Sequence, residues 1–347
     1  MKTCRPMILC LFALGCAPTG ATSSSSSGGS QPQSPTLAVK SYVTEQLELL
    51  HTAVDALKNA APAPDADGWN PTADAAAVEA MRTEWKKARN AYERVEGAIA
   101  VLFPELDAAT DERYDGFIAE AADDNLFDGT GVTGVHAVER ILWADSHRPE
   151  VVTFESGLPN YVAASFPTTE QQAREYKTSL LARLEEDVHT MLEEFGPLAL
   201  DPSSAFRGVV GSLEEQLEKV NLAYTAEDES RYAQHTLGDM RANLSGGKAT
   251  FDAFRAELRA KEGGADLETK VTSSFGRIET AYNAISGDAI PAVPEGWNPE
   301  SPSAEHLQTP YGQLFTILSE EADPEREGSL VHSMNLAADL LGIPQLP

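Results

Sequence analysis

Residues 81–102 carry the pattern that decides the fold, and they read MRTEWKKARNAYERVEGAIAVL. Apolar or small side chains recur there at alternating steps of four and three residues, at Met81, Trp85, Ala88, Tyr92, Val95, Ile99 and Leu102. Such steps keep side chains on one side of an α-helix, and an apolar stripe of this width is typical of a helix packed in a bundle. The segment therefore predicts a long helix with one buried face.

The rest of the chain after residue 37 shows the same helical character, and connectors rich in Pro and Gly separate the periodic segments. Further helices are predicted over residues 38–59, 134–145, 169–195, 205–223, 229–260, 265–286 and 328–341. Alternating patterns that would indicate strands are hard to find. The sequence therefore predicts an all-α fold.

A short repeated motif suggests that the helices fall into two related groups. DGWNP at residues 67–71 and EGWNP at residues 295–299 each follow a helical segment and a Pro-containing loop. A repeated motif of this kind favours duplication. The predicted halves are about 37–200 and 201–347, with a boundary near residues 195–204. The alternative is that Trp69 and Trp297 only pin loops to a bundle end.

The charge of the chain narrows the partners that it can bind. Its 26 Lys and Arg residues face 54 Asp and Glu residues, which gives a formal net charge of −28. A surface of that sign repels nucleic acid and anionic membrane surfaces and attracts cations. Nucleic acid is therefore not an expected partner, whereas a metal or a cationic ligand is.

The first 15 residues predict a secretory signal peptide. Lys2 and Arg5 precede an apolar run over residues 7–14, which is shorter than the ~20 residues that a membrane span requires. The following segment, ALGC at residues 13–16, resembles a bacterial lipobox, so Cys16 is expected to be lipidated. Ordinary signal cleavage is the alternative. Residues 16–36, rich in Ser, Gly and Pro, predict a flexible tether between a lipid anchor and the helical domain.

A candidate metal site begins in GVTGVHAVERILWAD, residues 131–145. His136 and Glu139 are three residues apart, so their side chains leave one face of a helix and can share a ligand. Gly131 and Gly134 allow close backbone approach where the helix starts. The alternative is an ordinary structural histidine.

Two further segments place polar groups beside apolar stripes. Glu93 and Glu96 flank the stripe that contains Tyr92 and Val95. A regular polar seam follows the stripe of the 229–260 segment, at Tyr232, Thr236, Asp239 and Asn243. These groups predict either a ligand-binding pocket or a hydrogen-bonded network that fixes helix register, in which Arg89, Arg94 and Arg241 would neutralise carboxylates.

The segments YERVE, TGVHAVERILW and YAQHTLGDMRANLSGG, in this order, resemble the imelysin-like family, which includes periplasmic iron-uptake lipoproteins. The family motif GxHxxE is matched by Gly134, His136 and Glu139. The resemblance covers about residues 40–345 and implies two four-helix bundles that form one domain over residues 37–347. It implies a metal held by His136 and Glu139 together with Glu96 and Asp239. Around these ligands we expect Glu93, Tyr232, Thr236 and Asn243.

The function that these observations favour is metal capture by a lipid-anchored protein of the bacterial periplasm or cell surface. One imidazole with several carboxylates suits iron, and zinc or manganese are possible. The expected partners are the membrane, through Cys16, and an iron permease or other uptake components. No enzymatic activity is expected. The alternatives are an imelysin-type metallopeptidase, although no HExxH or HxxEH occurs in the sequence, and a structural or polysaccharide-binding surface lipoprotein.

Overall fold

The computed structural model of the chain describes residues 34–344. Between these residues every regular element is a helix and no β-strand occurs, which confirms the predicted all-α class. The signal peptide, lipidation of Cys16 and nearly all of the tether lie outside the described residues and stay predictions. In the part of the chain that the structure describes, no helix is both long enough and apolar enough to cross a membrane.

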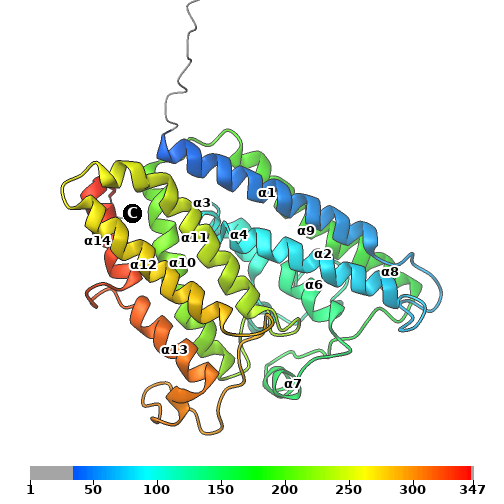
Figure 1. Cartoon of the computed structure of the whole chain (residues 1–347). Helices are drawn as coiled ribbons and strands as arrows, with labels where there is room; N and C mark the ends of the chain where they lie inside the picture. The colour runs from blue at the N-terminus through cyan, green and yellow to red at the C-terminus, as the bar shows by residue number, and fades with distance from the viewer. Residues whose placement is uncertain (1–33, 345–347) are drawn as a thin grey trace, which may run out of the picture. The chain divides into compact units, whose positions relative to one another are not determined.

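The helices follow one another along the chain, and the longest connection, residues 284–309, joins α12 to α13 (Figure 1). They are α1 (Pro35–Ala60), α2 (Ala75–Glu93), α3 (Glu96–Leu102), α4 (Pro104–Asp111), α5 (Tyr114–Glu120), α6 (Gly134–Leu142), α7 (Pro149–Ser156), α8 (Glu170–Glu175), α9 (Leu181–Phe195), α10 (Pro202–Ala223), α11 (Thr236–Arg259), α12 (Gly264–Asn283), α13 (Pro310–Glu321) and α14 (Leu330–Leu341). A π-helical turn, Tyr176–Leu180, joins α8 to α9, and a 3-10 turn, His306–Gln308, precedes α13.

Local sequence explains why several of these helices begin where they do. Asp201 precedes α10, and its carboxylate accepts hydrogen bonds from the backbone amides of Ser203 and Ser204 at 2.8 and 3.1 Å. Pro202 occupies the first position of α10, where a missing N–H costs nothing. Ser34 and Thr309 cap α1 and α13 in the same way, and each helix again starts with proline.

The helices pack in two groups that meet at the centre of the unit formed by the described residues (Figure 1). α1 lies along α2 and α9, while α10, α11 and α12 lie side by side, with α13 and α14 packed against α10 and α12. α3 packs against α10, and α11 contacts both α1 and α2. The connection between α9 and α10 falls inside the predicted boundary region. That the two halves superpose stays a prediction.

The two Trp-Asn-Pro loops are anchored by similar aromatic contacts. Trp69 meets Tyr176 edge to face at a centroid distance of 4.8 Å, and Trp297 meets Tyr311 in the same way at 4.9 Å. A phenylalanine lies beside each indole, Phe166 at 5.7 Å and Phe315 at 5.1 Å. Both tryptophans are buried, so each pins its loop to the helices.

The single helix predicted over residues 81–102 is wrong, because α2 ends at Glu93 and α3 begins at Glu96. Val95 lies between them with φ −125° and ψ −5°, outside helical geometry. The carbonyl oxygen of Glu93 accepts a hydrogen bond from the side-chain amide of Asn243 at 2.8 Å instead of continuing the helix. The helix is therefore interrupted between Glu93 and Glu96.

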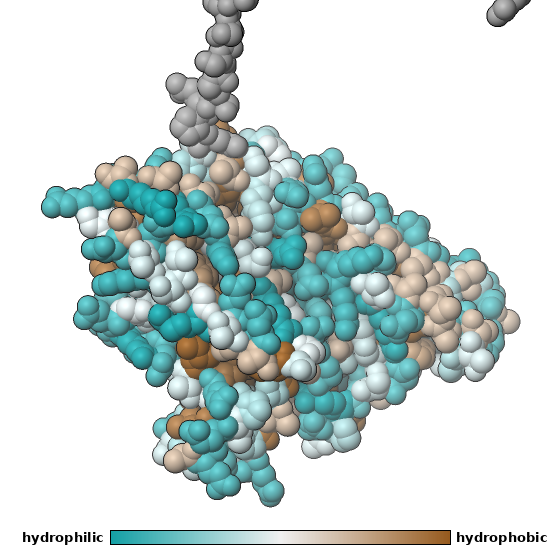
Figure 2. All heavy atoms as spheres, viewed as in Figure 1, coloured by the Kyte–Doolittle hydropathy of each residue, from teal (hydrophilic) through white to brown (hydrophobic). Residues whose placement is uncertain are grey.

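The helix predicted over residues 229–260 also begins later than expected, at Thr236. Residues 229–235 form a buried turn, and the backbone of Gln234 takes a positive φ of 55°. α4, α5 and α7 carry too few residues for a clear apolar period and were not predicted. α13 was not predicted either, although it has the same 12 residues as α14. The face shown in Figure 2 is mostly hydrophilic, with scattered hydrophobic side chains, in keeping with the acidic composition.

Candidate metal centre

Several helices bring their polar side chains to one buried place where the two groups of helices meet. Six carboxylates, one imidazole and two cationic side chains gather there, namely Glu93, Glu96, Asp111, Glu139, Glu229, Asp239, His136, Arg89 and Lys219. All except Asp111 are buried residues, and the side chain of Asp111 is 14% exposed. Such a concentration of charge away from water requires close pairing.

The imidazole of His136 is oriented by Glu139. Its Nδ1 atom lies 2.7 Å from Oε2 of Glu139, while Oε1 of Glu139 accepts hydrogen bonds from the backbone amides of Tyr232 and Ala233 at 3.0 and 2.7 Å. A carboxylate that accepts from two amides accepts from Nδ1–H as well, so we place a proton on Nδ1 in both the charged ring and the ring that has lost its Nε2 proton to a ligand. The Nε2 atom is then the one available to a ligand.

The Nε2 atom of His136 points to the end of α4. It lies 3.5 Å from Oδ1 of Asp111 and has no hydrogen-bond partner among residues 34–344. Gly134, the first residue of α6, has a φ of +81°, and a Cβ there would lie 2.5 Å from the carbonyl oxygen of Thr110. Glycine therefore allows α6 to start directly against the end of α4, which sets the distance between His136 and Asp111.

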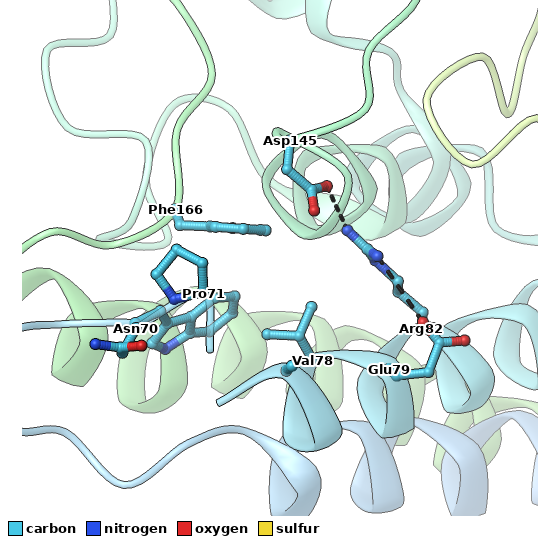
Figure 3. Close-up of a pocket in the computed structure, with 9 residues that line it drawn as sticks. Asn70, Pro71, Val78, Glu79, Arg82, Asp145 and Phe166 are labelled. Atoms are coloured by element: carbon cyan, nitrogen blue, oxygen red, sulfur yellow. Dashed lines mark hydrogen bonds and ion pairs between the residues drawn. The ribbon is translucent and has the colours of Figure 1, made fainter. Parts of the chain in front are cut away.

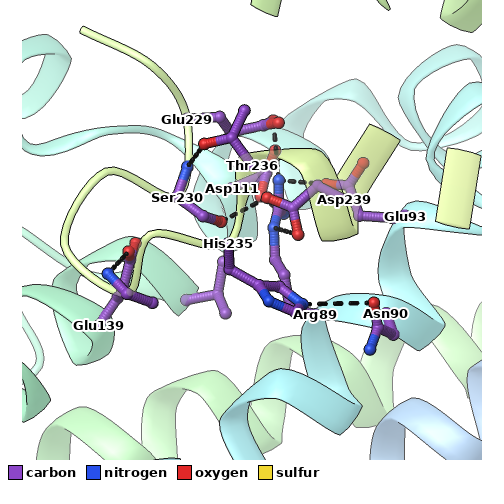
Figure 4. A network of polar contacts seen from close by, with 12 residues as sticks. Arg89, Asn90, Glu93, Asp111, Glu139, Glu229, Ser230, His235, Thr236 and Asp239 are labelled. Atoms are coloured by element: carbon purple, nitrogen blue, oxygen red, sulfur yellow. Dashed lines mark hydrogen bonds and ion pairs between the residues drawn. The ribbon is translucent and has the colours of Figure 1, made fainter. Parts of the chain in front are cut away.

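Arg89 of α2 holds several of the carboxylates together (Figure 4). Its guanidinium forms ion pairs with Glu93 and Asp111, and with Glu229 at 2.7 Å, while its Nε atom lies 3.5 Å from Oδ1 of Asp239. The side chain is fully buried. Arg89 is one of the three arginines that the network alternative named. Arg94 instead contacts Gln46, and Arg241 contacts Asp288.

Lys219 of α10 provides the second buried cation. Its Nζ atom lies 2.7 Å from Glu229, 2.9 Å from Glu93 and 3.2 Å from Glu96. The side-chain oxygen of Asn243 is 3.3 Å from the same atom, and the Asn243 amide donates to Glu96 at 2.7 Å. Oxygen atoms from four segments of the chain therefore surround the ammonium group of Lys219.

Negative charge exceeds positive charge in this cluster. If every group is ionised, six carboxylates face Arg89, Lys219 and His136, which leaves three negative charges (six minus three) without a cation. Burial raises the pKa of Glu93 well above its ordinary value despite the nearby Arg89. Burial also outweighs Lys219 at Glu96 and raises the pKa of that carboxyl to about 8. The arrangement favours an additional cation.

Two other groups of the cluster are held in their charged forms. Burial and Arg89 oppose protonation of His136, but Asp111 and Glu139 outweigh them and raise its pKa to about 9. Burial alone would raise the pKa of Glu229, yet Lys219, Arg89 and His136 lower it well below its ordinary value. A metal bound at His136 would therefore have to displace a proton at neutral pH.

Donor atoms fall into two overlapping groups whose members lie within 4.8 Å of one another. One group contains His136, Asp111 and Glu229, and the other contains Glu93, Glu96, Asp111 and Glu229. The first offers one nitrogen and carboxylate oxygens, which suits iron, zinc or manganese, and the second offers oxygen alone. The Nε2 atom of His136, which has no hydrogen-bond partner among the described residues, and this donor set fit a metal ion.

The residues that the sequence assigned to the site take different places. His136, Glu139, Glu96 and Asp239 all lie in the cluster, but Asp239 is not among the grouped donor atoms. It contacts Arg89 and accepts a hydrogen bond from the hydroxyl of Ser230. Thr236 accepts a hydrogen bond from the amide of Ser230 at 3.1 Å. Asp239 and Thr236 therefore hold the turn that carries Glu229.

The remaining predicted neighbours each contact a member of the cluster. The Tyr232 amide donates to Glu139, Glu93 accepts from Lys219, and Asn243 donates to Glu96. The sequence did not indicate Asp111, Glu229 or Lys219. Asp111 and Glu229 stand in acidic stretches, DAATDE and TAEDES, without a helical period that would distinguish them from solvated residues. Lys219 occurs in an ordinary charged run, EEQLEK.

A separate surface pocket of about 210 Å³ lies beside Trp69 and Phe166 (Figure 3). Arg82 lines one side of it, donates to the carbonyl oxygen of Leu142 at 2.7 Å and pairs with Asp145. The arginine therefore fixes the carboxyl end of α6, the helix that carries His136, to α2. We assign no ligand to this pocket.

Comparison with known proteins identifies relatives of the chain. The family model described as imelysin, peptidase M75, matches residues 38–316. The iron uptake system component EfeO of Escherichia coli strain K12 is 26% identical over 243 residues, which are 70% of this chain and 51% of that protein. EfeO of Shigella flexneri matches with the same identity and coverage. The chain spans about half the length of these curated relatives.

Proposed function

The chain belongs to the imelysin family, and from that premise we propose that it captures a metal ion, with iron as the expected cargo, for uptake across a bacterial membrane. The observation that carries this proposal is the buried Nε2 atom of His136, which lacks a hydrogen-bond partner among the described residues and faces Asp111. The excess of carboxylates around it supports a cation as the missing partner.

The contacts assign separate roles to the residues of the cluster. We propose that Nε2 of His136 and oxygen atoms of Asp111 and Glu229 bind the ion. Glu139 then holds the imidazole through Nδ1, and Asp239 fixes Arg89 and the turn that carries Glu229. This assignment differs from the sequence prediction, which made Glu139, Glu96 and Asp239 ligands together with His136. A carboxylate behind a ligating histidine is common in metal sites and strengthens the ligand.

Iron uptake is proposed from the printed names of the relatives and from the donor set. Two relatives are named as components of an iron uptake system. A mixed nitrogen and oxygen set accepts iron, and zinc or manganese would also bind. We further propose a lipid anchor at Cys16, a location in the periplasm or on the cell surface, and transfer of the ion to a membrane permease.

We propose that the chain acts as a binding protein and not as a peptidase, although the family carries a peptidase name. Hydrolysis by a zinc site needs a carboxylate free to take a proton from the metal-bound water. Glu139, the carboxylate of the GxHxxE motif, already accepts from two amides and from His136. Because these three contacts occupy both oxygen atoms of Glu139, they favour a structural role for that carboxylate.

The test is the metal affinity of the His136→Ala variant. We expect its affinity for Fe²⁺, Zn²⁺ and Mn²⁺ in titration calorimetry to fall by more than about 100-fold. Removing the carboxylate behind a ligating histidine usually lowers metal affinity by about 10- to 100-fold, and removing the ligand itself should lower it more. Helicity measured by circular dichroism should stay unchanged. His189→Ala is the matched control, because His189 also faces a glutamate of its own helix, Glu193 at 3.2 Å, but lies exposed on α9. Equal affinity in the parent and in His136→Ala would refute the proposal.

A further inference from the structure

We propose that Lys219 occupies a second cation position, so that the centre is built for two cations and the protein supplies one of them from its own side chain. This inference rests on the proposed function, because it treats the group around His136 as the first cation position. The second position offers only oxygen atoms and would accept a hard divalent cation, but Lys219 fills it.

The two donor groups share a pair of carboxylates. Asp111 and Glu229 belong both to the group with His136 and to the group with Glu93 and Glu96. Two shared carboxylates between neighbouring cation positions are the arrangement of a bridged pair of ions, in which each bridging group offers one oxygen to each side. Arg89 contacts both shared carboxylates and Glu93, which keeps the two groups in register.

Lys219 lies where an ion of the second group would bind. Its Nζ atom contacts three of the four carboxylates of that group, Glu93, Glu96 and Glu229, at 2.7 to 3.2 Å. A fourth oxygen, from Asn243, lies at 3.3 Å. Manganese, magnesium or calcium binds oxygen at about 2.0–2.6 Å, so a modest inward movement of these side chains would complete a metal shell.

An independent observation shows that a cation is expected beside the shared carboxylates. The His136 side chain is completely buried, and its Nε2 atom has no hydrogen-bond partner in residues 34–344 while facing Asp111. The two positions differ in chemistry, because the first includes nitrogen and the second only oxygen. Lys219 therefore limits the centre to one metal, at the position with the imidazole.

The inference predicts the number of ions bound by variants of Lys219. The probe is Mn²⁺, measured by equilibrium dialysis with metal analysis and by electron paramagnetic resonance of the folded chain. We expect one ion per parent chain and two per Lys219→Ala chain, because the shortened side chain leaves room for an ion among Glu93, Glu96 and Glu229. Two bridged Mn²⁺ ions should also show magnetic coupling that a single ion lacks.

Two controls isolate the role of the ammonium group. Lys219→Arg keeps a cation at this place and should bind one ion. Lys248→Ala removes a lysine from the exposed pair that Lys248 forms with Glu279 at 3.0 Å, and should also bind one ion. One ion per Lys219→Ala chain, with helicity intact, would overturn the inference and leave the proposed function standing. A parent chain that binds no ion would refute both.

A second variant decides the question if Lys219→Ala does not fold. Glu96 belongs only to the group that Lys219 fills, whereas Asp111 belongs to both groups. Glu96→Gln should therefore change the affinity of the parent for its single Mn²⁺ by less than threefold, while Asp111→Asn should lower it at least tenfold. Equal losses in the two variants would mean that Glu96 binds the first ion, and would overturn the inference.

Discussion

At the scale of single residues, Glu139 links the imidazole to the turn before α11. Its Oε2 atom faces His136, and its Oε1 atom accepts from the amides of Tyr232 and Ala233. The residue therefore transmits the position of that turn, which also carries Glu229, to the ring that offers Nε2. Burial raises the pKa of Glu139, while His136 and the Ala233 amide oppose this and stabilise the carboxylate form.

Replacing Glu139 by glutamine tests this link. The amide oxygen of glutamine can still accept a backbone hydrogen bond, but its NH₂ group cannot accept one from Nδ1. We expect the affinity for Zn²⁺ to fall by about 10- to 100-fold, the usual effect of removing a carboxylate behind a ligating histidine. Titration calorimetry measures the change. Glu193→Gln, which alters the exposed partner of His189, should bind like the parent, and a loss in both variants would argue against a local effect.

At the scale of elements, α3 and α10 approach each other through two glycines. A Cβ on Gly208 of α10 would collide with the carbonyl oxygen of Gly97 in α3, and one on Gly97 would lie 2.6 Å from the carbonyl oxygen of Gly208. The backbones of the two helices therefore touch. Because α3 begins with Glu96 and α10 carries Lys219, this contact brings the carboxylate and the ammonium group within reach of each other.

Two alanine substitutions on α10 should have opposite effects. Gly208→Ala forces α10 away from α3, and overpacking of this kind costs about 1–3 kcal/mol in the free energy of unfolding. Gly211→Ala meets nothing within 4 Å and should stabilise the chain by up to about 1 kcal/mol, because alanine favours a helix over glycine. Urea denaturation measures both changes. Destabilisation of similar size by the two substitutions would contradict the backbone contact.

At the scale of the whole unit, the proposed ligands come from distant parts of the chain. Asp111 and His136 precede the connection between α9 and α10, and Glu229 follows it. The sequence predicted the helices well where an apolar stripe is long, as at α1, α10 and α12. It predicted that the side chains of His136 and Glu139 lie on one face of a helix, because residues three apart in a helix are neighbours.

The sequence could not reveal the rest of the cluster, because that depends on packing between distant segments. Nothing local relates Asp111 to Glu229 or Lys219, which meet only when α4, α10 and the turn before α11 come together. The break between α2 and α3 was missed for the same reason, since the group that satisfies the Glu93 carbonyl oxygen belongs to Asn243 of α11. Short-range patterns do not report such contacts.

A bound ion should stabilise the two groups of helices together. Because its ligands join both groups, we expect Zn²⁺ at a free concentration of about 100 times its dissociation constant to raise the free energy of unfolding by about 2.7 kcal/mol. Thermal unfolding followed by circular dichroism should show one transition that moves upward as a whole. His136→Ala should abolish the shift. Two transitions, of which only one responds to Zn²⁺, would show that the ion binds within one group of helices.

The burial of His136 has a consequence for the rate at which an ion could be exchanged. The ring is fully enclosed by α6 and its neighbours, and every residue of α6 is buried. An ion that leaves Nε2 must wait until side chains or helices around it part, so its residence time depends on the frequency of that opening as well as on its affinity. Tight enclosure would make spontaneous loss slow, and an acceptor that opens the junction could collect the ion far sooner than solvent.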